Sequence, residues 1–153
     1  ISNKKLRGGS IYTLSKNASD KEAAALARRE NKSDLILGFD LNKENKSVAK
    51  VLIDISQNYT KNESIKFAKI LASELGKRIR MLRSPLRSAG FTVLKAPAIP
   101  SVLLELGYLS NSVDERLLRS SKHRRLISSI IVTAISKYFS TNKLFAGHKT
   151  DKF

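Results

Sequence analysis

The segment VLKAPAIPSVLLELGYLSN, residues 93–111, constrains the fold more than any other part of the sequence. Its two apolar runs, separated by prolines, predict one strand over AGFTVLKAP and another over SVLLELGY. A strand with apolar residues on both faces is typical of a sheet that is covered on both sides. The one carboxylate in the second run, Glu105, is costly to bury without a partner. The segment therefore indicates a layered fold, and it suggests a functional role for Glu105.

Helical patterns alternate with these strands. The stretch GGSIYTLS, residues 8–15, predicts a further strand. A capping box of Ser19 and Glu22 then opens an Ala-rich helix that runs to about Asn31. Strands that alternate with helices indicate an α/β domain, and 153 residues are enough for one such domain.

Apolar residues at helical spacing predict three more helices. One covers residues 48–59, and a longer one runs from about residue 62 to just before Pro85. A second capping box, Ser112 to Glu115, precedes the last helix. That helix has two adjacent apolar ridges, which predict a wide buried face: Leu126, Ile130, Ala134 and Tyr138, and Ile127, Ile131, Ile135 and Phe139.

The formal net charge of +16 predicts attraction to polyanions such as nucleic acid, anionic lipid or an acidic cell-wall polymer. No apolar run is long enough to span a membrane, and the first residues lack the apolar core of a signal peptide. The absence of cysteine excludes disulfides and thiolate metal sites. Because the chain begins with Ile, we expect a processed product or part of something longer.

Candidate metal ligands are scarce, because the sequence has two histidines, His123 among basic neighbours and His148 in the polar tail. Phosphate-loop and G-x-S-x-G motifs are absent, which disfavours nucleotide hydrolysis and serine esterase chemistry. The basic stretch 76–88 is either a polyanion contact or the solvated end of the long helix. Glu105 is either an edge residue or partner of a buried arginine, or a general base at a strand end.

Residues 93–111 closely resemble a block of the zinc-dependent N-acetylmuramoyl-L-alanine amidases, which cut peptidoglycan between the sugar strand and the stem peptide. RGGSIYTLS, RRENKSDLI and LRSAGFTVLK resemble neighbouring blocks of that family, so the resemblance extends over about residues 6–139. It implies a three-layer α/β domain with a mixed, largely parallel sheet flanked by helices. It also implies that Glu105 is the catalytic glutamate, which works with zinc by activating the attacking water.

The resemblance leaves the zinc ligands without counterparts. The family's two histidines and glutamate precede the segment equivalent to RGGSIYTLS, so no residue of this sequence maps onto them. We therefore expect residues 1–141 to form the C-terminal part of one amidase domain that lacks its first strands, followed by a polar tail over 142–153. Alone, this part is expected to be inactive and, because its sheet is cut open, poorly soluble.

Residues 40–60 raise a regulatory hypothesis, because some relatives carry an extra helix there that covers the active site until a division-associated activator removes it. By that resemblance Glu44 would occupy the open metal position; the alternative is an ordinary surface insertion. The resemblance implies a periplasmic location. Two rivals remain open: a catalytically dead wall-binding or regulatory remnant, and a basic nucleic-acid-binding domain that rests on charge alone.

Overall fold

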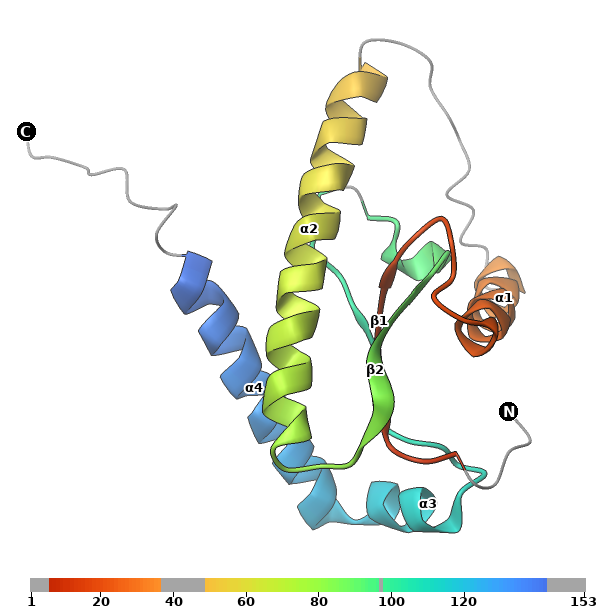
Figure 1. The fold of residues 1–153 in the computed structure, drawn as a ribbon, viewed down its shortest axis with the longest axis vertical. Helices are drawn as coiled ribbons and strands as arrows, with labels where there is room; N and C mark the ends of the chain where they lie inside the picture. Colours follow the sequence, from red (N-terminus) through yellow and green to blue (C-terminus); the bar gives the residue numbers. More distant parts are fainter. Residues whose placement is uncertain (1–5, 37–48, 97, 143–153) are drawn as a thin grey trace, which may run out of the picture.

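The computed structural model describes residues 6–36, 49–96 and 98–142, which form helices around a small sheet (Figure 1). The elements in chain order are β1 Gly9–Leu14, α1 Lys21–Ile36, α2 Ala49–Gly76, β2 Met81–Ala89, the 3-10 turn η1 Thr92–Leu94, β3 Leu103–Glu105, α3 Ser112–Arg119 and α4 Ser121–Asn142. None of the described helices is long and apolar enough to cross a membrane. The predicted α/β class is confirmed.

The described strands form one sheet in the order β2-β1-β3. β1 runs parallel to β2 and antiparallel to β3, so the sheet is mixed, as predicted, with one pairing of each kind. Because β3 is antiparallel to β1, its last residue, Glu105, lies opposite Ser10 near the start of β1. This topology places the candidate catalytic residue at the end of the sheet where β1 begins.

Two hydrophobic cores cover the two faces of the sheet. Neighbouring residues of a strand point to opposite faces, so Ile11 and Tyr12 of β1 belong to different cores. Helices α2 and α4 pack on the face of Ile11, and α1 packs on the face of Tyr12 (Figure 1). The apolar character of β1 and β3 on both faces follows from this sandwiched position.

Helix α2 corrects the prediction of two separate helices over 48–59 and 62–84, because it is one continuous helix. Near the expected break the buried hydroxyl of Ser64 donates to the carbonyl oxygen of Thr60 at 2.8 Å and accepts from the backbone N–H of Ser101 at 2.9 Å. These two bonds satisfy the buried hydroxyl of Ser64. The helix therefore continues through a polar stretch that the sequence alone suggested was a boundary between two helices. The helix also ends earlier than predicted, at Gly76, because the chain turns there to enter β2.

Strand β2 corrects a second prediction, because the strand precedes AGFTVLKAP instead of lying within it. Pro85 falls where the register with β1 shifts, between the pairs Gly9–Met81 and Ile11–Leu86. A proline cannot donate to a strand ladder, and such an irregularity accommodates it. The apolar residues after Gly90 instead turn under α1, where Phe91 is fully buried.

The start of each capped helix differs by one residue from the predicted capping boxes. At α1, Asp20 caps the helix, and its Oδ1 accepts the backbone N–H of Ala23 at 2.8 Å. At α3, the cap is Asn111, whose Oδ1 accepts the N–H groups of Val113 and Asp114. Each carries a short side-chain oxygen, which caps a helix as well as serine does.

Helix α4 buries one apolar ridge and exposes part of the other. Ile130, Ala134 and Tyr138 of the first predicted ridge are buried, as is Ile127 of the second, whereas Ile135 and Phe139 of the second ridge are 39% and 61% exposed. In Figure 1 the later part of α4 diverges from α2 and lies away from the sheet. The prediction of a wide buried face is therefore wrong for the second half of this helix.

Candidate active site

Glu105 ends β3 and points to the face of the sheet that α1 covers. Leu104 packs into the core of α2 and α4, so its neighbours Leu103 and Glu105 point the other way. There the Oε2 atom of Glu105 lies 3.3 Å from the Ser10 hydroxyl and 3.3 Å from the Tyr12 hydroxyl. The carboxylate is half-buried and hydrogen-bonded, which accounts for a charge at the end of an apolar strand.

A third hydroxyl, that of Tyr108, is buried beside the same carboxylate. Burial raises the pKa of Tyr108, and the negative charge of Glu105 raises it further. Both effects keep the phenol neutral, and its buried hydroxyl lies close to Glu105 and Ser10 without a hydrogen bond to any described residue. The candidate base therefore sits among three hydroxyl groups, two of them from β1 and one from the loop after β3.

Arg87 of β2 contacts this group of hydroxyls through Tyr12. Its Nη1 atom donates to the Tyr12 hydroxyl at 3.5 Å, and its guanidinium forms ion pairs with Asp20 and Glu22 at the start of α1. Burial alone would lower the pKa of Arg87, but the hydrogen bonds with Tyr12 and Glu22 outweigh it and the pKa is raised. Sequence reasoning missed this role, because it placed Arg87 in a basic stretch interpreted either as a polyanion contact or as the solvated end of a helix.

The loop after Glu105 is fixed by Asp114, a buried residue in the first turn of α3. Its Oδ2 atom accepts the backbone N–H of Gly8 at 2.8 Å and that of Tyr108 at 3.1 Å, and Arg7 approaches its Oδ1 at 3.4 Å. Gly107 has a φ of 142°, and a Cβ there would lie 2.9 Å from Asp114 Oδ2. The carboxylate thus ties the start of β1 to the segment that carries Tyr108.

A cavity of about 320 Å³ opens beside this loop. Its wall combines Glu105 with an arginine of α1 and with the loop: Arg29, Gly107, Tyr108, Leu109 and Ser110. Arg29 also pairs with its neighbour Glu30 at 3.0 Å. The cavity gives the carboxylate access to a molecule that enters from solvent, which a general base requires.

The described residues do not fit a zinc site. They contain no group of three or more His, Cys, Asp or Glu side chains that could hold a metal ion. The nearest polar side-chain atoms around Glu105 are hydroxyls, whereas protein zinc sites use histidine, cysteine and carboxylate ligands. His123 is half-buried at the start of α4, and both His148 and Glu44 lie outside the described residues.

Comparison with known proteins shows the family to which this chain is related. The family model described as "Amidase_3: N-acetylmuramoyl-L-alanine amidase" matches residues 1–137. The chain is 35% identical over 140 residues to the amidase AmiC of Escherichia coli O6:H1, a match that covers 91% of this chain and 33% of the relative. It is 32% identical over 144 residues to AmiA of Escherichia coli K12, which covers 91% of this chain and 48% of the relative.

A solved structure shares the fold. It is that of the amidase Ami1 from Mycobacterium smegmatis, with a TM-score of 0.55 and 18% identity over 91% of this chain and 50% of the other. The chain spans about a third to a half of the length of these three proteins. With a family model that matches nearly all of its described residues, the chain belongs to the N-acetylmuramoyl-L-alanine amidase family.

Proposed function

We propose that this chain forms the C-terminal part of an amidase domain that hydrolyses the amide between N-acetylmuramic acid and L-alanine in peptidoglycan, with Glu105 as general base. The observation that carries the proposal is the place of Glu105: it ends β3, faces a cavity and is held by neighbouring hydroxyls. The net charge of +16 suits an acidic wall polymer.

The two oxygens of Glu105 have different surroundings, which suits a base. Both hydrogen bonds from Ser10 and Tyr12 go to Oε2, and within the described residues none reaches Oε1. The bonded oxygen orients the carboxylate, and Oε1 is left to accept the proton of a water that attacks the substrate carbonyl. A base that is already oriented needs less rearrangement in the transition state.

Zinc is implied by the family resemblance, and in such enzymes it acts as a Lewis acid on the carbonyl or water. Because the described residues lack a ligand set and no residue of this sequence maps onto the family's ligands, we propose that the zinc ligands are not among these 153 residues. The 153-residue chain alone is therefore proposed to be inactive. Without the metal, the transition state would lose several kcal/mol of stabilisation, and each loss of about 1.4 kcal/mol slows the reaction tenfold.

The test joins this chain to the family's zinc-ligand segment and measures release of stem peptides from purified cell walls. Glu105→Gln keeps the shape of the side chain but cannot accept the proton, so turnover is expected to fall by about 10²–10⁴-fold with zinc content unchanged. Glu115→Gln, at a partly exposed position of α3, is the matched control and is expected to retain activity. Turnover near the native rate in the Glu105 variant would refute the assignment.

Localisation and regulation are part of the same proposal. We propose a periplasmic enzyme of cell-wall remodelling and daughter-cell separation, with a division-associated activator acting on residues 40–60 and Glu44. The rival is a wall-binding remnant without activity, and it too accounts for the lack of a ligand set among the described residues. The two differ in one measurement, because the remnant binds cell walls but releases no peptide when the zinc-ligand segment is supplied.

A further inference from the structure

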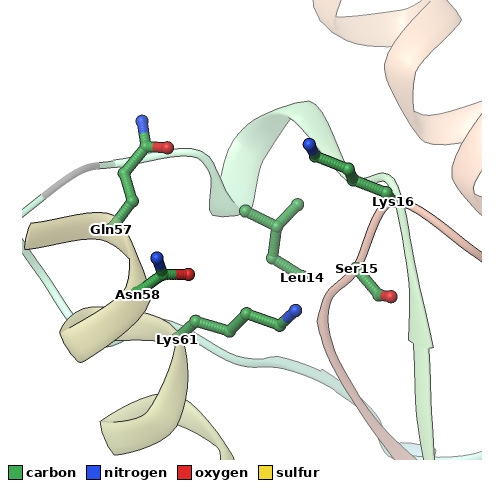
Figure 2. A pocket seen from close by; sticks show the side chains of 6 residues that line it. All are labelled: Leu14, Ser15, Lys16, Gln57, Asn58 and Lys61. Carbon is green, nitrogen blue, oxygen red and sulfur yellow. The ribbon is translucent and has the colours of Figure 1, made fainter. Parts of the chain in front are cut away.

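A second cavity, of about 360 Å³, lies at the other end of β1 from Glu105. It is open to solvent and lined by the end of β1, the residues that follow it and one turn of α2: Leu14, Ser15, Lys16, Gln57, Asn58 and Lys61. In Figure 2 the side chains of Lys16 and Lys61 approach Leu14 from opposite sides, although they are far apart in the sequence. From Ser10 to Ser15 the strand advances roughly 17 Å, so the cavity is separate from the candidate active site.

The two lysines bring positive charge to this cavity. Among the residues whose side chains the structure describes, none that lines it is acidic, and no ion pair joins Lys16 or Lys61 to any of their acids. Some other lysines have such partners: Lys66 pairs with Glu63, and Lys137 pairs with Glu74 at 2.6 Å. Two ammonium groups and two amides in one lining, with no acid among its described residues, have the chemistry of an anion site.

The other residues that line the cavity restrict the class of ligand that it can bind. The amides of Gln57 and Asn58 and the Ser15 hydroxyl supply neutral hydrogen-bonding groups, and the Leu14 side chain supplies an apolar surface between the two ammonium groups. Its volume is that of a small-molecule pocket. A carboxylate that carries a short aliphatic group matches both parts of this lining.

We propose that this cavity binds a carboxylate of the peptide part of peptidoglycan. This inference rests on the proposed function, because that function makes a peptide-bearing wall polymer the substrate. Lys16 and Lys61 contact the carboxylate, and Leu14 contacts the aliphatic side chain next to it. Since a polymer presents many stem peptides, a second contact away from Glu105 raises the affinity of the enzyme for the wall without a role in the bond cleavage.

The experiment measures binding to the ¹⁵N-labelled 153-residue chain by NMR titration, with three probes: a stem tetrapeptide with free carboxylates, the same peptide with its carboxylates amidated, and inorganic phosphate. The double variant Lys16→Gln/Lys61→Gln removes both charges of the cavity. The double variant Lys32→Gln/Lys122→Gln removes two exposed lysines from α1 and α4 and is the matched control. The two variants carry the same net charge.

We expect the free peptide to shift resonances around Leu14 and Asn58 and to bind about tenfold more weakly to the cavity variant than to the native chain or the control. The amidated peptide and phosphate are expected to bind much more weakly than the free peptide. Equal binding by both double variants, equal binding of the amidated peptide, or phosphate binding as tight as that of the peptide would each overturn the proposal. Binding is read without catalysis, so this result is independent of whether the Glu105→Gln test succeeds.

Discussion

Asp114 makes the strongest stability prediction, because one buried carboxylate holds two distant segments. In Asp114→Ala the backbone N–H groups of Gly8 and Tyr108 lose their acceptor, and the ion pair with Arg7 is removed. A hydrogen bond to a charged group contributes about 1.5–3 kcal/mol, so two such bonds predict a loss of about 3–5 kcal/mol after some relaxation. That loss is a large part of the roughly 5–15 kcal/mol by which small domains are stable.

The assay is urea unfolding of the 153-residue chain at micromolar concentration, followed by circular dichroism. Asp114→Asn retains one oxygen acceptor and is expected to lose about half as much stability. Glu115→Ala, next in sequence, removes a partly exposed ion pair with Arg119 and is expected to cost about 0.3–0.5 kcal/mol. If Asp114→Ala unfolds within about 1 kcal/mol of the native chain, the carboxylate does not hold these segments.

Three further predictions follow from the same structure. Gly107→Ala is expected to lower the free energy of unfolding by about 1–3 kcal/mol, because φ is 142° and the new Cβ would lie 2.9 Å from an oxygen of Asp114. In the same unfolding assay the control Gly76→Ala, whose Cβ would lie 3.9 Å from its nearest atom, is expected to be neutral or stabilising. Burial opposes a low pKa at Asp20, but hydrogen bonds at the start of α1 hold this pKa below 3.8. The contribution of Asp20 to stability is therefore present above pH 3.8 and is lost as the pH falls through the folded pKa. Acid unfolding of Asp20→Asn is expected to lack that loss. The pKa of Tyr108 is raised above 10 by burial and by Glu105, so stability is expected to decline as the pH rises above about 10, and absorbance titration of Glu105→Gln is expected to show ionisation at lower pH.

Local patterns in the sequence were sufficient for several elements. The Ala-rich stretch after Asp20 and the apolar periodicity after Ser121 form α1 and α4, because short-range preferences and a repeating apolar face agree there. The same local reasoning placed both helix starts within one residue of the true caps. It failed at β2, where Pro85 and basic residues gave no strand pattern and pairing with β1 supplied the missing hydrogen bonds.

By itself the sequence determined the α/β class, the family and the singular position of Glu105, because these depend on residue order and on a block of nineteen residues. The tertiary structure alone decided what surrounds Glu105. Ser10, Tyr12 and Arg87 come from strands that lie at least 18 residues away in sequence, and the pairing of β1 with β2 and β3 brings them together. No periodicity encodes such contacts, since each depends on the register between strands and on which face of the sheet a side chain occupies.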